Sequence, residues 1–486
     1  MTFKKNGGSS NILRKKSLDM IIEDANDKKH ALKKSLSWFD LILFGIGAII
    51  GTGIFVLTGV AAAKYAGPGL ILSFILSGIA CTFAALSYAE FASTFPAAGS
   101  TYSYSYVALG EIFAWIIGWD LILEYAFAIP TIALGWSGYF TSLLHSFGVN
   151  IPAWAANSAS SAHGGIINLP AIGIVLLLGI ILLFGTKESS IINNIAVIFK
   201  IMVVLFFIAV AVWHVHPSNW KPFLPYGWKG VFSGAAIIFF AYIGFDSVST
   251  AAEETKNPER DMPIGILGSL GISTLLYIVV VAILTGVVSY TKLNTPEPVA
   301  FALTSLGINW ASGLVSFGAI AGITTVLLVM MYGQTRIFFA MSRDGLLPPL
   351  LSKLHEKFKT PVASTIIVAL FAALVAGFFS IDELAKLVNI GTMFAFVLVS
   401  IAVIVLRYTK PDLPRKFRCP FVPLIPILSI ASTVFLMISL PLETWIRFIV
   451  WFVLGIIIYF FYGYRHSKLA QNDYKGVKVE SLYKEV

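Results

Sequence analysis

The feature that most constrains this chain is a succession of twelve apolar stretches, most of them near or above the length of about 20 residues that an α-helix needs to cross a bilayer. Charged residues make up only 12% of the 486 residues, against about 25% in a soluble domain. The sequence therefore predicts an all-α membrane protein with twelve transmembrane helices. The expected spans are residues 38–62, 68–94, 108–144, 167–185, 189–214, 230–254, 264–290, 312–341, 362–380, 384–407, 422–441 and 444–464.

Three segments need a separate interpretation. The third stretch is too long for one perpendicular crossing and too short for two, and it contains Pro130, so we expect one tilted helix there. Residues 95–107 are too polar for a span and are expected to form a re-entrant or interfacial segment on the inner side. Residues 293–309 are expected to form an outer capping segment.

The distribution of basic residues predicts the orientation of the chain. With the N-terminus inside, the inner segments and adjoining helix ends contain 27 of the 34 Lys and Arg residues, the outer loops contain six, and Lys200 lies within a span. Cytoplasmic segments of membrane proteins carry such an excess. We therefore expect a plasma-membrane protein, in contact with membrane lipids, with both termini cytoplasmic. The net charge of +9 then reflects topology and does not indicate nucleic-acid binding.

Several other functions are not indicated by the sequence. Cys81 and Cys419 lie far apart and define no disulfide framework. We find no metal-ligand spacing, phosphate-binding loop or nucleophile elbow, so we expect no enzyme, no cofactor and no metal site. A channel is disfavoured because no filter motif or ring of charges is evident, and a receptor-like sensor because no appended soluble domain is evident.

The first stretch contains four glycines in the run from Gly45 to Phe55. Each glycine weakens a helix by about 1 kcal/mol relative to alanine. The run therefore predicts an interrupted helix, whose unpaired backbone groups must face protein or a cavity. The sixth stretch has a similar weak point at Gly244, followed by Asp246, which is expected to be a cap or gate residue. Ordinary glycine packing faces between helices are the alternative.

The two weak points lie five helices apart, and a unit with an odd number of helices inverts when it is repeated. The pattern thus predicts two inverted repeats with discontinuous helices 1 and 6, an arrangement common in secondary transporters. The predicted divisions are a cytoplasmic N-terminal tail at 1–35, a first repeat at 36–215, a second repeat at 230–408, accessory helices at 422–464 and a cytoplasmic C-terminal tail at 465–486.

A broken helix presents free N–H groups where its second half begins and free carbonyls where its first half ends. These groups suit the carboxylate and the ammonium of an amino acid. The carboxylate is expected on the N–H groups of Gly51, Thr52 and Gly53, beside Ile54. The ammonium is expected on carbonyls near Ile49 and in the segment made of Phe240, Ala241, Tyr242 and Ile243.

Lys200 lies about eleven residues into the fifth stretch, about 16 Å from the helix start and too deep for its ammonium to reach the interface comfortably. An ionisable residue at such depth costs at least about 2.5 kcal/mol and indicates a function. Because burial disfavours the charged amine, Lys200 is a candidate for proton coupling. A fixed ammonium that caps carbonyls is the alternative.

Acidic residues also occur inside or near the spans. Glu124 follows Asp120 by four residues on one face of the third stretch. Glu124 could attract a cationic substrate, pair with Lys200 or carry a proton, or it could be a neutral carboxyl with a packing role. Glu90, Glu253 and Glu254 lie near helix ends, where we expect solvation or salt bridges with Arg260 or Arg343.

Three separated motifs resemble a known superfamily. They are the glycine run at 45–55, Glu-Glu-Thr-Lys-Asn-Pro-Glu-Arg-Asp-Met-Pro at 253–263, and Ser-Arg-Asp-Gly-Leu-Leu-Pro at 342–348. In this order, over about residues 30–465, they resemble the amino acid, polyamine and organocation transporter superfamily. The loop at 408–418 more narrowly resembles bacterial relatives of the cationic amino acid transporters. The resemblance implies a LeuT-like five-plus-five inverted repeat, alternating access and a substrate site between spans 1 and 6.

The resemblance also implies roles for single residues. In sodium-coupled relatives a cation bridges the first, fifth and eighth spans, and in proton-coupled relatives a lysine on the fifth span takes that place, as Lys200 would here. It implies proton-coupled uptake of a cationic or small neutral amino acid, with a proton-independent exchanger or facilitator as the alternative. Any small accessory membrane subunit stays unknown. Side-chain selectivity is expected from Glu124, Phe240, Ile243, Thr324 and Met393.

Overall fold

The computed structural model describes residues 13–15, 36–94, 100–160, 164–184, 190–356 and 360–471. Most of the predicted N-terminal tail, residues 95–99 of the predicted re-entrant segment and residues 472–486 of the C-terminal tail lie outside these ranges. The described residues form helices, and their only strand-like pairings are two isolated β-bridges. The predicted all-α class is therefore confirmed.

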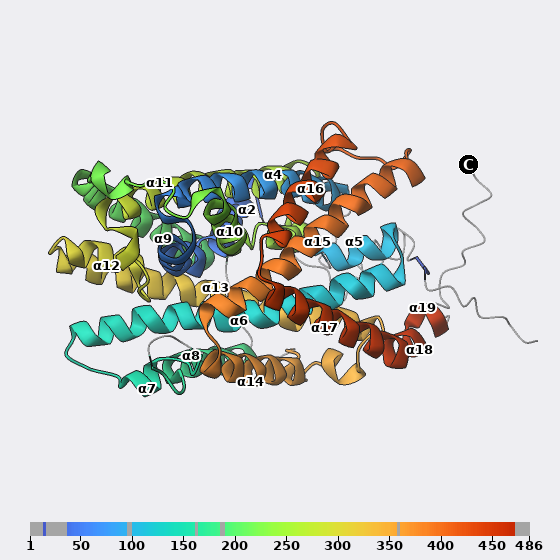
Figure 1. The fold of residues 1–486 in the computed structure, drawn as a ribbon. Coiled ribbons are helices and arrows are strands. Elements are labelled where there is room, and N and C mark those ends of the chain that lie inside the picture. Colours follow the sequence, from blue (N-terminus) through green and yellow to red (C-terminus); the bar gives the residue numbers. More distant parts are fainter. Residues whose placement is uncertain are drawn as a thin grey trace, which may run out of the picture.

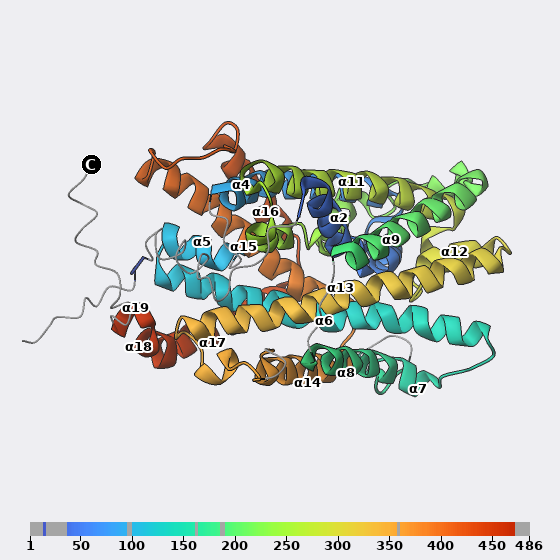
Figure 2. The same ribbon diagram turned by 180° about the vertical axis from the view of Figure 1, so that it is seen from behind.

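Every one of the twelve apolar stretches contains helix in the structure. The longest of these helices, including α4, α6, α11 and α13, run roughly along one direction (Figures 1 and 2), and twelve helices of at least 12 residues are present in the described part of the chain. They are α2 (Trp38–Ile49), α4 (Leu70–Thr94), α6 (Glu111–Ser146), α8 (Leu169–Leu183), α9 (Ser190–Ala211), α10 (Gly227–Ile238), α11 (Pro258–Val287), α13 (Asn309–Arg343), α14 (Val362–Phe378), α15 (Ile381–Thr409), α16 (Leu424–Ile438) and α17 (Leu442–Ile458).

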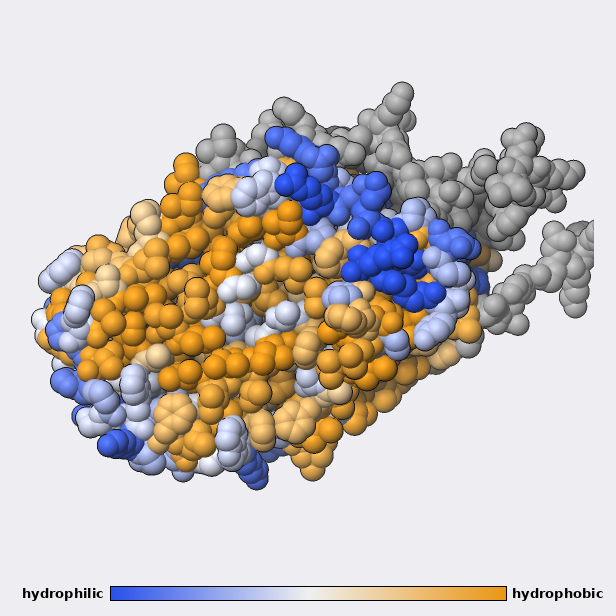
Figure 3. All heavy atoms as spheres, turned by 90° about the horizontal axis from the view of Figure 1, so that it is seen from above, coloured by the Kyte–Doolittle hydropathy of each residue, from blue (hydrophilic) through white to orange (hydrophobic). Residues whose placement is uncertain are grey.

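Within the described residues, eight helical segments are long and apolar enough to cross a membrane. Four more apolar helices are shorter, namely α2, α8, α14 and α16. In the space-filling view apolar residues cover most of one face, and hydrophilic residues gather toward its two ends (Figure 3). Length, apolarity and this surface identify a protein that spans a membrane several times.

The helix α6 is continuous for 36 residues through Pro130, which confirms the prediction of one long helix in the third stretch. It lies beside α13 (Figures 1 and 2), and the two helices run antiparallel. Trp136 of α6 donates a hydrogen bond to Thr324 of α13 over 2.9 Å, and farther back along α6 Tyr125 packs on Gly333. These two contacts fix the register, so Trp136 lies at the level of Thr324 and Tyr125 at the level of Gly333.

Short helices mark the two ends of the molecule. They are α3 (Thr58–Ala61), α5 (Ser100–Ala108), α7 (Ala153–Ala156), α12 (Pro298–Ser305), α18 (Tyr464–His466) and α19 (Lys468–Gln471). Helices α7 and α12 lie at one end, and α5, α18 and α19 at the other (Figure 1). We call these the Glu297 end and the Glu90 end, after a carboxyl group at each.

Candidate functional site

The first apolar stretch is interrupted directly after α2. This helix begins with a capping box, in which Ser37 and Asp40 cap each other's backbone N–H groups, and it ends at Ile49. Ile50 is extended, with φ −76° and ψ 104°, and helical backbone resumes as η1 (Gly53–Leu57). The first N–H groups of the resumed helix have no carbonyl one turn earlier to accept their hydrogen bonds. The glycine run therefore contains a break with free donors on its second half.

The sixth stretch is interrupted in a similar way. After α10 the chain forms the 3₁₀ turn η6 (Phe239–Tyr242), becomes extended at Ile243 and resumes as η7 (Asp246–Glu254). Gly244 has a φ of +118°, a conformation that side chains disfavour. Asp246 accepts a hydrogen bond from the Gly244 N–H over 3.1 Å. Asp246 therefore caps the backbone at the break.

The two breaks pack directly against each other. A Cβ atom on Gly53 would collide with the backbone of Ala241, and a Cβ on Gly244 would lie 2.8 Å from the carbonyl carbon of Ala48. Glycine at both positions therefore allows the two interrupted backbones to approach. This contact brings together nine residues that the sequence predicts for the substrate site, all of them buried: Ile49, Gly51, Thr52, Gly53, Ile54, Phe240, Ala241, Tyr242 and Ile243.

A tyrosine that sequence reasoning missed joins the two breaks. The hydroxyl oxygen of Tyr277, on α11, lies 2.9 Å from the carbonyl of Ile49 and 2.9 Å from the carbonyl of Ala241. One phenolic proton can satisfy only one of these acceptors at a time. The signal in the sequence was a hydroxyl within an apolar helix, because a buried tyrosine usually has a polar partner.

Lys200 connects three helices next to the first break. Its Nζ donates to the carbonyl of Gly47, in the last turn of α2, over 2.9 Å. The stem of the lysine passes Gly322 of α13, where a Cβ would lie 2.9 Å from the Cε of Lys200. The side chain is completely buried. A group on α9 therefore holds the end of α2 and packs on α13.

The predicted selectivity residues occupy two levels of the bundle. Thr324 lies at the level of the breaks, since Val326, two residues away on α13, contacts the Cβ position of Gly51 at 3.3 Å. Thr52 approaches the Ile132 carbonyl of α6 at 3.4 Å. Glu124 lies eight residues before Ile132, which is about 12 Å along the helix toward the Glu90 end.

Glu124 belongs to a buried polar layer below the breaks. It interacts with Thr392 of α15 and electrostatically with Asp120 and Asp246. Met393, the next residue on α15, is also completely buried. Glu124 therefore lies in the protein interior beside Asp246 of the second break, and Met393 is buried on the neighbouring α15.

A cavity of about 620 Å³ opens at the Glu297 end. Its walls include Val56 and Leu134, and Val56 is only three residues beyond Gly53 in the resumed first helix. The neighbouring Gly135 has its Cβ position 3.1 Å from Val56 and also contacts Thr52. The cavity thus extends to about one helical turn from the first break.

Salt bridges close the Glu90 end. Glu90 is buried and pairs with Arg407 at 2.7 Å and with Arg415 at 3.1 Å, and it accepts a hydrogen bond from the Cys419 N–H. Tyr102 of α5 also donates to Asp344 over 2.7 Å. The expected pairing of Glu90 with Arg260 or Arg343 was therefore wrong, because the last turn of α15 supplies Arg407 and the segment after α15 supplies Arg415 and the Cys419 N–H.

Two facing helix breaks inside a multi-span bundle, with a cavity that leads toward them, are features of helical membrane transporters whose substrates bind at discontinuous helices. The chain belongs to the amino acid permease family, whose model matches residues 36–462. This match confirms the resemblance that the three sequence motifs predicted.

Similar proteins cover nearly the whole chain. The branched-chain amino acid permease BcaP of Bacillus subtilis is 54% identical over 464 residues, which are 95% of this chain and 99% of the relative. The methylthioribose transporter of the same organism is 51% identical over 460 residues, with the same coverage. The vacuolar cationic amino acid transporter 4 of Arabidopsis thaliana is 31% identical and aligns over 96% of this chain and 97% of its own length.

Proposed function

We propose that this protein is a secondary active transporter that takes up a branched-chain amino acid across the plasma membrane, driven by an inward proton gradient. The observation that carries the proposal is the contact between the two helix breaks. There the carbonyls of Ile49 and Ala241 converge on the single hydroxyl of Tyr277.

The breaks supply partners for both charged ends of an amino acid. The N–H groups of Gly51, Thr52 and Gly53 begin a helix, where the helix dipole favours a carboxylate. The Tyr277 hydroxyl satisfies one of its two neighbouring carbonyls, and the other is available to an α-ammonium donor. The protein backbone would in this way recognise the part that all α-amino acids share.

An apolar substrate side chain fits the surroundings better than a cationic one. Buried side chains at the breaks include Ile54, Phe240 and Ile243, and Val326 contacts the first break from α13. The carboxyl of Glu124 interacts with Thr392 of α15 and with Asp246 of the second break. Two similar proteins are named for different substrates, one for branched-chain amino acids and the other for methylthioribose. The zwitterion partners at the breaks favour the amino acid.

Lys200 is the proposed proton carrier. As an ammonium it donates to the Gly47 carbonyl and holds α9 to the end of α2 beside the site. Loss of its proton weakens this charge-assisted hydrogen bond and loosens the first break. Protonation from outside, amino acid binding, reorientation and joint release inside then form one transport cycle. Glu124 is a second proposed proton site.

The proposed membrane arrangement has twelve spans, with repeats at 36–215 and 230–408 and accessory helices at 422–464. The excess of basic residues in the inner segments supports a cytoplasmic position for the tails at 1–35 and 465–486. The Glu297 end then faces outward and the Glu90 end faces the cytoplasm. The cavity at the first end and the salt bridges at the second fit a conformation open to the outside.

Uptake of labelled leucine into proteoliposomes tests the proposal. An inward proton gradient should drive accumulation, and unlabelled isoleucine and valine should compete better than arginine or methylthioribose. Leucine uptake at the same rate with and without the proton gradient would support the alternative, a proton-independent exchanger or facilitator. Competition by methylthioribose without competition by any amino acid would contradict the substrate assignment.

A further inference from the structure

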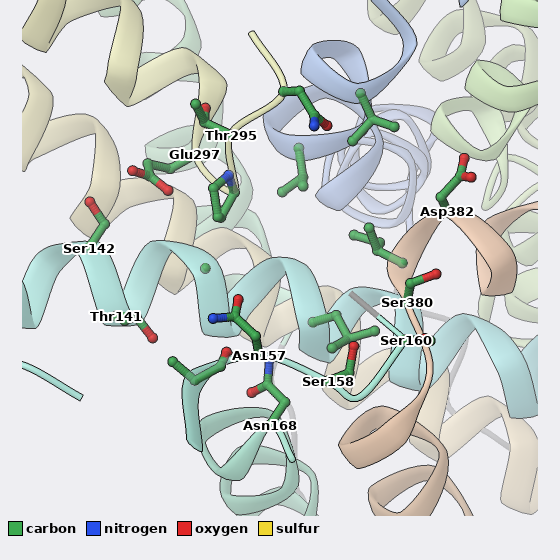
Figure 4. Close-up of a pocket in the computed structure, with 18 of the residues that line it drawn as sticks. Thr141, Ser142, Asn157, Ser158, Ser160, Asn168, Thr295, Glu297, Ser380 and Asp382 are labelled. Atoms are coloured by element: carbon green, nitrogen blue, oxygen red, sulfur yellow. Dashed lines mark hydrogen bonds between the residues drawn. The ribbon is translucent and has the colours of Figure 1, made fainter. Parts of the chain in front are cut away.

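Five separate segments line the cavity at the Glu297 end, one of them the first apolar stretch with Val56 and Lys64, and many of the lining side chains are polar. Figure 4 shows Glu297 and Thr295, from the segment before α12, near Ser142 of α6, while Ser380 and Asp382 lie on the far side at the start of α15. Asn157 and Asn168, on either side of the loop from α7 to α8, form another wall. The volume of about 620 Å³ lies within the range of small-molecule sites.

Two of the three carboxylates that line this cavity already have partners. Asp382 pairs with Lys386 at 2.7 Å and also accepts a hydrogen bond from Tyr65. Glu383 lies 3.7 Å from Arg447 and caps the start of α15. Both carboxylates therefore already have a cation beside them.

Glu297 and Lys64 differ from these paired groups. The carboxyl of Glu297 interacts with the hydroxyl of Ser142 and with its own backbone N–H. Within the described part of the chain, Glu297 has no basic partner and Lys64, also in the cavity wall, has no acidic one. The cavity thus contains one acid and one base that are not paired with each other.

Further unsatisfied groups lie in the same wall. The buried hydroxyl oxygens of Thr141 and Thr295 have no hydrogen-bond partner among the described residues, and both threonines line the cavity. Buried polar atoms are normally satisfied by protein, water or ligand. These hydroxyls therefore point to an occupant that forms hydrogen bonds.

We infer that this cavity is a second, weaker amino acid site, in which Glu297 binds the α-ammonium and Lys64 binds the α-carboxylate of an incoming substrate. The inference rests on the proposed function, because it assumes that the transported molecule is a zwitterion. The site lies partly open to solvent, so its two ion pairs are weak. It collects amino acid at the outer mouth, about one helical turn from the first break.

Equilibrium binding of radiolabelled leucine to the purified full-length protein tests this site at pH 8. The wild type should bind one leucine tightly at the breaks and a second one weakly. Glu297→Gln and Lys64→Gln should each weaken the second binding step by about 5-fold, which corresponds to losing about 1 kcal/mol of interaction. Retained tight binding in the same titration shows that these variants are folded.

Control variants separate the two sites. Glu443→Gln removes a carboxylate from the exposed first turn of α17, outside the cavity lining, and should change neither step. Gly53→Ala should remove the tight step and leave the weak one. Isopentylamine and 4-methylpentanoate each carry one of the two charges, and both should compete for the weak site.

The outcomes distinguish the inference from the proposed function. One tight leucine per chain, with no weaker step, would overturn the second site and leave the transporter proposal intact. A weak step that survives both Glu297→Gln and Lys64→Gln would also overturn it. Absence of any leucine binding by the wild type would refute the proposed substrate itself.

Discussion

Replacement of Lys200 by methionine should abolish proton-driven accumulation of leucine and preserve measurable leucine binding. Methionine keeps an unbranched apolar stem beside Gly322 but can neither hold a proton nor donate to the Gly47 carbonyl, which the lysine reaches over 2.9 Å. Leaving a buried carbonyl without its donor costs about 1–3 kcal/mol of folding free energy. Removal of a buried ammonium offsets part of that cost.

The size of the transport effect follows from the gradient. One pH unit is worth about 1.36 kcal/mol per proton, which is a factor of about ten in a concentration ratio. With one proton per amino acid, an inward gradient of about two pH units can drive about 100-fold accumulation. Lys200→Met should lower this ratio to about one. Lys200→Arg should also fail to accumulate leucine, because arginine keeps its charge and does not release its proton.

The assay is uptake of labelled leucine by proteoliposomes with an acidic exterior and a neutral interior. Lys386→Met is a matched control, because Lys386 lies at the Glu297 end and pairs with Asp382 rather than with the first break. It should still accumulate leucine. Accumulation by Lys200→Met at the wild-type level would refute proton coupling through Lys200. Loss of leucine counterflow exchange by Lys200→Met would instead indicate that the residue supports the fold of the site.

Three further outcomes are expected. Gly53→Ala forces a Cβ into Ala241, so it should lower the free energy of unfolding by about 1–3 kcal/mol and remove tight leucine binding. Gly173→Ala is the control, because its Cβ would enter open space, and it should have neither effect. Normal leucine binding by Gly53→Ala would contradict the close contact between the breaks. Glu90→Gln leaves two guanidinium groups without their carboxylate and should lower the free energy of unfolding, measured with denaturant, by about 3–5 kcal/mol. The control Glu259→Gln removes an exposed carboxylate and should lower it by less than about 1 kcal/mol. Equal losses of stability in the two variants would exclude a closing role for Glu90. Burial raises the pKa of Glu297 to about 7. The ionised fraction of Glu297 should therefore fall from about 0.9 at pH 8 to about 0.1 at pH 6. The other ionisable residues that line the cavity are Lys64, His145, Asp382 and Glu383. The weak leucine step should weaken over that interval in the wild type and stay flat in Glu297→Gln, and a flat wild-type profile would count against Glu297.

Local features of the fold were predictable from the sequence because they depend on short-range properties of the chain. Long apolar stretches predicted the helices, and all twelve contain helix in the structure. The four glycines of the run at 45–55 in the first stretch and Gly244 in the sixth predicted where helices 1 and 6 are interrupted, since each glycine weakens its own turn. The depth of Lys200 within its stretch also predicted that its side chain would be buried.

Partners between helices were harder to predict, because they depend on helix rotation and register. The Gly47 carbonyl reaches Lys200 across 153 residues of sequence, and Tyr277 reaches Ile49 across 228. No local sequence pattern indicates which of two residues so far apart in the chain will be in contact. The pairing expected for Glu90 failed for the same reason, since several arginines lie near that end of the bundle and only packing selects among them.

The sequence by itself therefore determined the membrane-spanning helical class, the positions of the two breaks and the family, because hydropathy, glycine propensity and motif order are properties of the chain read along its length. Only the tertiary structure decided that the breaks face each other across Gly53 and Ala241, that Tyr277 joins their carbonyls, and that Glu297 and Lys64 line one cavity. These are contacts between segments far apart in sequence. They form because close packing of the helices and the hydrogen bonds between them set the register of the polar groups at their interfaces.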